Sequence, residues 1–121
     1  MVKARIDTNI LIDYLTGVPQ ARAALAHYPR AAISIINWMQ VLAGASATQQ
    51  AGTATFLNNF DLIDLDAAIA AQAVIERRAR RMKLPDAIIW ATAQTAALLL
   101  VTRDTKDFLA GDPGVRIPYR L

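Results

Sequence analysis

The chain alternates short apolar runs with longer segments in which apolar residues recur at helical spacing. Short apolar runs bounded by turn residues predict buried strands, whereas helical spacing predicts helices with one buried face. The predicted strands cover residues 2–6, 31–35, 61–65, 98–102 and 115–117. The predicted helices cover residues 8–15, 19–28, 37–47, 48–60 and 85–97, and a further helix, capped by Asp66, runs to residue 82. Turn-forming residues at 16–19 and Pro29 separate these elements.

Most of the predicted strands are separated by pairs of helices. This order predicts an α/β fold, a three-layer sandwich in which a central, mostly parallel sheet of four to five strands is flanked by helices. The 121 residues suffice for one hydrophobic core but not for two, and no linker or repeat interrupts them. We therefore expect a single domain over residues 1–121.

The composition narrows the class of protein. The chain is 55% hydrophobic, yet no apolar run approaches the roughly 18 residues of a membrane span. It contains no cysteine, which excludes disulfides and thiolate metal sites. The first residues enter a strand pattern at once and lack the layout of a signal peptide. These features predict a cytoplasmic protein with no membrane partner.

The net charge is +3, but the distribution of the charges is more informative than their sum. Four arginines, Arg77, Arg78, Arg80 and Arg81, form a tight block near the end of a predicted helix. Because the guanidinium group binds phosphate well, this block is compatible with an anionic partner such as nucleic acid. A solvated helix face, or pairing with acids of a partner protein, explains it equally well.

Four aspartates lie at the ends of predicted elements. Asp7 follows the first strand and Asp86 opens a helix after Pro85. Asp104 and Asp107 follow the apolar strand at 98–102. Because clustered carboxylates repel one another, acids in such positions indicate a bound cation or a set of arginine partners. Asp7 and Asp104 fall at the carboxyl ends of strands, the edge where sites form in parallel sheets.

Polar neighbours of these acids are candidates for supporting roles. Thr8 and Asn9 supply a hydroxyl and an amide that could orient the Asp7 carboxylate or a phosphate, and the start of the following helix favours anions. An ordinary helix cap, with Thr8 as the capping residue, accounts for the same residues. Asp13 is interpreted as an arginine partner behind the site or as one side of a surface salt bridge.

Four segments together resemble the PIN-domain ribonucleases, and within them the VapC-type toxins of toxin–antitoxin pairs. The matching segments are 6–13 (IDTNILID), 33–44 (ISIINWMQVLAG), 84–89 (LPDAII) and 101–108 (VTRDTKDF). They span nearly the whole chain. Each motif is short, but the four in this order and at these spacings are fairly specific.

The resemblance implies a PIN-like fold and a metal-dependent endoribonuclease. The implied ligands of Mg²⁺ or Mn²⁺ are Asp7, Asp86, Asp104 and Asp107, with Thr8, Asn9, Ser34 and Thr102 in support. Hard oxygen ligands suit these ions, and the metal would activate water for attack on a phosphodiester of RNA. The implied partners are RNA, a cognate VapB-type antitoxin and a second copy of the chain in a homodimer.

Gln40 departs from the family pattern, which places a glutamate six residues after Ser34. A glutamine keeps an oxygen at this catalytic position but carries no charge. A unit charge about 4 Å away is worth at most roughly 4 kcal/mol at an effective dielectric constant near 20. Its loss would lower metal affinity or turnover by up to a few powers of ten. Natural divergence and an engineered replacement both remain open.

Two alternatives to an active toxin follow from the same residues. The first is a degenerate PIN domain that binds antitoxin or RNA but cleaves poorly because of Gln40. The second is a phospho-accepting receiver domain, which also gathers acids at strand ends. The receiver pattern requires an acidic pair after the first strand, whereas Asp7 is followed by Thr8 and Asn9. The residues therefore favour the PIN interpretation.

Overall fold

The computed structural model describes residues 3–108 and 111–121 and contains a five-stranded sheet. The strands are β1 (Ala4–Ile6), β2 (Ala32–Ser34), β3 (Asp61–Ile63), β4 (Leu99–Val101) and β5 (Val115–Arg116). Their order across the sheet is β3-β2-β1-β4-β5, and every pairing is parallel. The predicted sheet is thus confirmed, with β1 at its centre.

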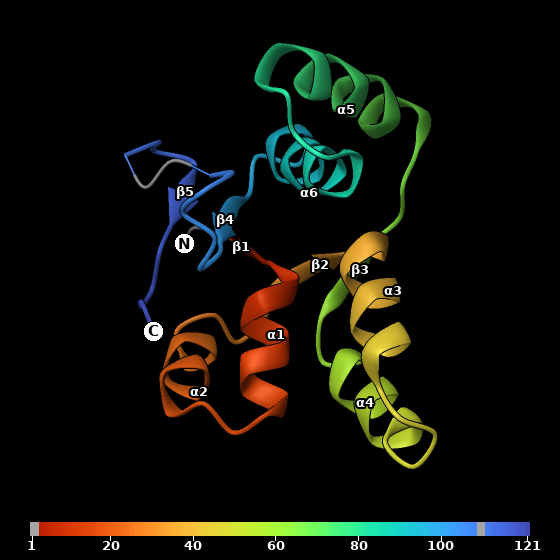
Figure 1. The fold of residues 1–121 in the computed structure, drawn as a ribbon, viewed down its shortest axis with the longest axis vertical. Coiled ribbons are helices and arrows are strands. Elements are labelled where there is room, and N and C mark those ends of the chain that lie inside the picture. Colours follow the sequence, from red (N-terminus) through yellow and green to blue (C-terminus); the bar gives the residue numbers. More distant parts are fainter. Residues whose placement is uncertain (1–2, 109–110) are drawn as a thin grey trace.

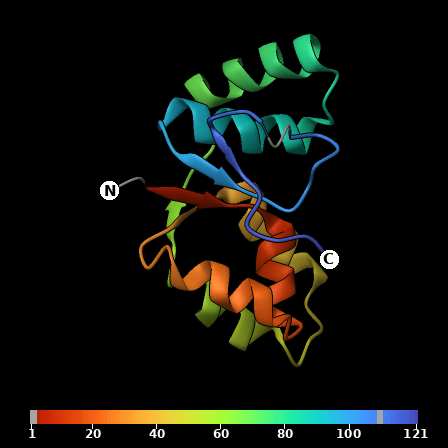
Figure 2. The same ribbon diagram turned by 90° about the vertical axis from the view of Figure 1, so that its left-hand side faces the viewer.

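Six helices cover the two faces of this sheet. They are α1 (Thr8–Leu15), α2 (Pro19–Ala26), α3 (Ile35–Gly44), α4 (Gln50–Leu57), α5 (Ala67–Arg80) and α6 (Leu84–Thr95). Helices α1 to α4 lie on one side of the sheet, and α5 and α6 lie on the other (Figure 1, Figure 2). The three-layer sandwich predicted from the sequence is confirmed.

The two faces of the sheet support two separate cores. Leu100 packs with α5, α6 and Phe108, whereas the next residue, Val101, packs with α1 to α4. This alternation follows from the two-residue period of a strand. Within β1, Ala4 and Ile6 belong to the core of α1 to α4. The residue between them, Arg5, therefore faces the opposite side.

Helix α1 has the predicted bounds, but the other elements are shorter than predicted and some begin elsewhere. Helix α3 begins at Ile35 instead of 37, because the Ser34 side chain accepts a hydrogen bond from the Asn37 amide and caps the helix. Helix α1 is capped by Asp7, so the prediction of Thr8 as the capping residue is wrong. Val2, in the first predicted strand, lies outside the described residues. Among the described helices, none has the length and apolar character required to cross a membrane.

Candidate metal centre

The candidate site lies at the carboxyl edge of the sheet, between β1 and β4. The chain moves outward from β1 through β2 to β3 and then returns to place β4 on the other side of β1. Such a reversal of strand order opens a crevice at the carboxyl ends of the strands. Asp7 directly follows β1, and Asp104 lies three residues beyond Val101, the end of β4. Asp86 reaches the same edge from the first turn of α6.

Three of the four predicted acids form a compact group. Asp86, Asp104 and Asp107 each offer a carboxylate oxygen, and these oxygens lie within 4.8 Å of one another. All three residues are half-buried. Burial, and then the charges of Asp107 and Asp7, raise the pKa of Asp86 to about 6. A divalent metal ion bound to this set of oxygen donors would relieve the repulsion.

Asp7 lies beside this group but is not a member of it. Its carboxylate is buried and accepts hydrogen bonds from the Thr8 amide at 2.8 Å and from the Thr102 hydroxyl at 2.7 Å. Burial raises the pKa of Asp7, whereas the positive charge of Arg5 and these hydrogen bonds act to lower it. The four-acid cluster expected from the sequence is therefore a group of three with a buried fourth acid next to it.

The loop after β4 is folded around one oxygen of Asp104. Asp104 Oδ1 accepts hydrogen bonds from the Lys106 amide at 2.9 Å and from the Asp107 amide at 3.1 Å. The Asp104 amide in turn donates to Thr102 Oγ1 at 3.0 Å. Thr102 is thereby bonded to both Asp7 and Asp104, so it joins the buried acid to the acidic loop.

Gln40 lies exposed on α3, next to Thr8. Its Oε1 accepts a hydrogen bond from Thr8 Oγ1 at 2.6 Å. Thr8 Oγ1 also accepts a hydrogen bond from Asn37 Nδ2 at 2.8 Å. Gln40 is therefore connected to the centre through Thr8. Asn9, another predicted supporting residue, donates to Thr102 Oγ1 at 3.3 Å.

Two further polar residues of the centre, Arg5 and Asn37, were not predicted from the sequence. Arg5 is fully buried, and its NH2 donates to Ser34 Oγ at 2.8 Å and to Asn37 Oδ1. Its Nε and NH1 have no hydrogen-bond partner among the described residues. Burial lowers the pKa of Arg5 to about 10. A lone arginine within an apolar strand is the sequence signal that could have pointed to this group.

Asn37 and Ser34 connect the centre to the start of α3. Asn37 is fully buried, and its Nδ2 lies 3.5 Å from Asp7 Oδ1. Ser34, predicted to support the site, caps α3 and accepts a hydrogen bond from Arg5, and among the described residues no hydrogen bond joins it to the acidic group. Asn37 thus lies between the buried positive charge of Arg5 and the carboxylate of Asp7.

Asp13 is paired with Arg103 behind the acidic loop. Arg103 donates from Nε to Asp13 Oδ2 at 2.7 Å and from NH2 to Asp13 Oδ1 at 3.0 Å. Tyr119 from the C-terminal segment donates its hydroxyl to Asp13 Oδ2 at 2.8 Å. The Asp13 side chain is 9% exposed. Of the two interpretations made from the sequence, the arginine partner fits this buried arrangement.

Comparison with known proteins identifies the family. The sequence model described as PIN domain matches residues 5–110. The chain belongs to the PIN domain family. No match was found among curated proteins.

Solved structures agree with this assignment. A toxin–antitoxin complex from Klebsiella pneumoniae contains a chain 47% identical to this PIN domain, with a TM-score of 0.93, covering 98% of this chain and 100% of that chain. DNA-bound VapBC from Salmonella typhimurium is 26% identical, with a TM-score of 0.78 and 96% of each chain covered. FitAcB from Neisseria gonorrhoeae, at 23% identity, a TM-score of 0.80 and coverage of 98% and 99%, shares the fold. The resemblance to VapC-type PIN toxins is thereby confirmed.

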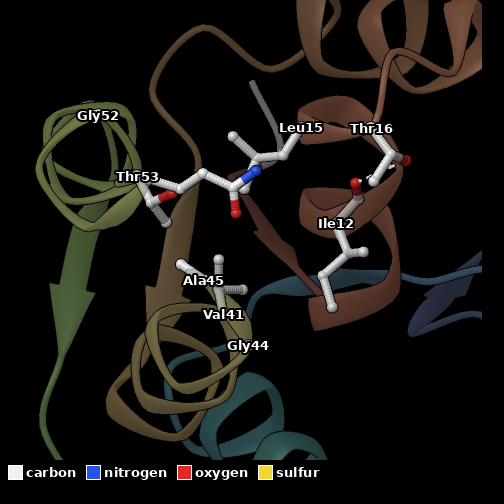
Figure 3. Close-up of a pocket in the computed structure, with 9 residues that line it drawn as sticks. Ile12, Leu15, Thr16, Val41, Gly44, Ala45, Gly52 and Thr53 are labelled. Carbon is white, nitrogen blue, oxygen red and sulfur yellow. Dashed lines mark hydrogen bonds between the residues drawn. The ribbon is translucent and has the colours of Figure 1, made fainter. Parts of the chain in front are cut away.

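An apolar groove continues from the centre of this PIN domain between α1, α3 and α4. It is lined by Ile12, Leu15, Thr16, Val41, Gly44, Ala45, Gln49, Gly52 and Thr53. Figure 3 shows the α1 side chains across the groove from those of α3 and α4. Ile12 and Gly44 lie one helical turn beyond Thr8 and Gln40, so the groove begins where the polar centre ends.

The arginine block of the PIN domain is divided in its contacts. Arg80 lies 3.6 Å from a carboxylate oxygen of Asp112, and its guanidinium stacks over Trp90 at 4.7 Å from the ring centroid. It therefore holds α5 against α6. Arg77, Arg78 and Arg81 are exposed, so the block presents positive charge to solvent at the end of α5.

Proposed function

We propose that this PIN domain is a metal-dependent endoribonuclease and the toxin of a toxin–antitoxin pair. The observation that carries the proposal is the group formed by Asp86, Asp104 and Asp107 at the carboxyl edge of the sheet. The similarity to a chain of the toxin–antitoxin complex from Klebsiella pneumoniae supports the biological role. Asp7, next to the group, is part of the proposed metal site.

Asp86, Asp104, Asp107 and Asp7 would hold Mg²⁺ or Mn²⁺, which supplies an activated water and neutralises charge on a phosphodiester when bound. The protein itself holds the ligand side chains in fixed positions. Thr102 fixes Asp7 and the amide of Asp104 through one hydroxyl. The Thr8 amide holds the other oxygen of Asp7. This preorganisation lowers the cost of gathering four negative charges at one place.

Gln40 sets the expected level of activity. It occupies the position of the glutamate in the family pattern, and its oxygen is engaged by Thr8. The amide adds no negative charge, so cation binding rests on the four aspartates. We propose an active but weakened nuclease. The alternative is a degenerate domain that binds antitoxin or RNA without efficient cleavage.

The test compares RNA cleavage with Mg²⁺ or Mn²⁺ by the original chain, by Gln40→Glu, and by Gln40→Glu combined with Asp104→Asn. We expect Gln40→Glu to cleave at least tenfold faster because an added negative charge beside the centre strengthens cation binding. The double variant should be inactive. Calorimetric titration should show the highest Mn²⁺ affinity for Gln40→Glu, a lower affinity for the original chain and the lowest for the double variant.

The outcomes separate the two candidates. If the original chain cleaves as fast as Gln40→Glu, the aspartates suffice and Gln40 is tolerated. If only Gln40→Glu cleaves, the original chain is a degenerate binder. If neither cleaves any RNA and neither takes up Mn²⁺, the nuclease proposal is wrong.

We further propose that the groove between α1, α3 and α4 receives a segment of the antitoxin. Its lining is mostly small and apolar, and it leads away from the acidic centre. A bound segment could therefore extend toward the acids and block them. The proposed assembly also contains a second copy of the chain. Two exposed apolar residues on α5, Val74 and Ile75, are available for that contact.

A further inference from the structure

We propose that Asp13, Arg103 and Tyr119, here called the Asp13 clamp, are positioning residues that hold the acidic loop, residues 102–108, in place. The inference rests on the proposed function of the acidic group. It goes beyond that function because none of the three residues belongs to the acidic group itself. Their action would be exerted through the loop backbone.

The clamp joins three parts of the chain that are far apart in sequence. Asp13 lies on α1, Arg103 lies between Thr102 and Asp104 in the acidic loop, and Tyr119 lies after β5. Asp13 accepts all three hydrogen bonds of the clamp, at 2.7 to 3.0 Å. The sequence separations are 90 residues to Arg103 and 106 to Tyr119.

Arg103 is held by its backbone as well as by its side chain. Its amide donates to Asn9 Oδ1 at 3.2 Å. Helix α1 therefore binds Arg103 at two points, through Asn9 and through Asp13. The neighbouring amides then follow in order: Asp104 donates to Thr102, and Lys106 and Asp107 donate to Asp104 Oδ1. A displacement of Arg103 would therefore move Asp104 and Asp107 relative to Asp86 on α6. Metal sites tolerate displacements of only about 0.5 Å.

Stability alone is a weak reason for this arrangement. A buried ion pair often adds little to the free energy of unfolding, because desolvation of both charges offsets their attraction. Arg103 also directly precedes Asp104, so its positive charge would oppose cation binding at the proposed site. Holding the acidic loop in a fixed position is a function that explains why an arginine stands at position 103.

Electrostatics and positioning therefore predict opposite signs for the replacement Arg103→Gln. If Arg103 acted only through its charge, its removal would strengthen binding of a cation. If Arg103 positions the loop, its removal weakens binding, because Asp104 and Asp107 lose their place opposite Asp86. The sign of the change distinguishes the two roles.

The experiment measures Mn²⁺ affinity by calorimetry and, in the metal-free protein, hydrogen exchange at the amides of Lys106 and Asp107. For Arg103→Gln we expect at least tenfold weaker Mn²⁺ binding and faster exchange at both amides. Arg103→Lys keeps the charge and one donor, so it should restore part of each loss. Tyr119→Phe removes one of the three hydrogen bonds and should have a smaller effect in the same direction.

Two control variants separate positioning from general destabilisation. Lys3→Gln breaks the exposed ion pair with Asp61 without touching the loop. Leu57→Ala opens the core under α4 and lowers the free energy of unfolding by about 2–5 kcal/mol. Both should leave Mn²⁺ affinity and the two exchange rates unchanged at temperatures where they are folded.

Mn²⁺ binding by Arg103→Gln that equals or exceeds that of the original chain overturns the proposal. So do unchanged exchange rates at Lys106 and Asp107. If the original chain takes up no Mn²⁺ at all, the proposed metal site fails, and the exchange measurement alone decides whether the clamp positions the loop.

Discussion

Asp86 lies where burial and neighbouring acids act on one carboxyl group. Their combined effect raises its pKa from 3.8 to about 6 in the folded protein. The folded chain therefore binds more protons than the unfolded chain between about pH 4 and pH 6. Because stability falls with pH wherever the folded state binds more protons, this group stabilises the fold fully below its unfolded pKa and loses that effect as pH rises through about 6.

We expect the free energy of unfolding of the metal-free protein to fall between pH 4 and pH 6, and the contribution of this group to level off above that. Asp86→Asn cannot titrate and should lose this part of the slope. Denaturant titrations at several pH values, with a chelator present, measure it. Mn²⁺ affinity should weaken below about pH 6, since protons compete for the same oxygens. Equal slopes in both proteins would refute the assignment to Asp86.

Arg5 shows where sequence reasoning stops at the residue scale. The run 2–6 was correctly predicted to contain a buried strand, but the fate of its arginine depends on what faces β1 from the neighbouring elements. Arg5 pairs in register with Ala32, which brings Ser34 and the start of α3 within reach of its guanidinium. Asn37 meets the same group because Ser34 caps α3 earlier than predicted. The register is a tertiary feature, and the sequence did not show that Ser34 caps α3, so neither partner was predicted.

At the scale of elements, α1, α3 and α4 form a surface with little side-chain bulk. Gly44 and Gly52 both line the groove, and a Cβ added at either would meet no atom within 4 Å. Gly52 lies inside α4, where leucine is a better helix former than glycine by roughly 0.8 kcal/mol. The groove can therefore be filled without disturbing the helix.

Gly52→Leu should weaken binding of the antitoxin at least tenfold and leave the melting temperature unchanged or slightly raised. The expected cause is steric, because the new side chain occupies the space proposed for the antitoxin segment. Ala51→Leu, at an exposed neighbour outside the groove lining, is the matched control. Calorimetry of the toxin–antitoxin complex and thermal melts measure both effects. Equal antitoxin affinity in the two variants would show that the antitoxin does not bind in this groove.

The order of elements was predictable because apolar runs and helical spacing differ clearly along this chain. The element ends were less predictable, since they depend on single capping contacts such as that of Ser34 with the Asn37 amide. Which acids of the site lie close together was likewise predictable only for residues that are near each other in the sequence. Asp104 and Asp107 share one loop and were expected together, whereas the separation of Asp7 from the three-acid group depends on packing that the sequence does not display.

For the molecule as a whole, charge is divided between an acidic centre and a basic end of α5. A centre of four acids repels the phosphates of RNA, so an RNA-cleaving enzyme needs positive charge elsewhere. Arg77, Arg78 and Arg81 are exposed and suited to phosphate contacts. We propose that they bind the RNA backbone without reading its sequence.

Replacing these three arginines by glutamine should weaken binding of single-stranded RNA and lower the slope of log affinity against log salt by about 2, since each phosphate contact contributes about 0.7. The measurement is fluorescence anisotropy in an Asp104→Asn background, which separates binding from cleavage. A triple variant at Arg22, Arg30 and Arg120, all exposed, removes the same charge elsewhere. If both triple variants lower the slope equally, the effect is one of net charge and the block is not a binding site.

The place of β4 next to β1 has a consequence for the order in which the protein is made. Ile6 pairs with Val101, so the two strands that carry the centre are separated by most of the chain. A ribosome delivers Asp7 and Asp86 before Asp104, and Tyr119 follows later still. The acidic centre can therefore assemble only after residue 107 has emerged. A nascent copy that ends before residue 104 lacks two of its four acids, so on the proposed function such a copy lacks the complete metal site.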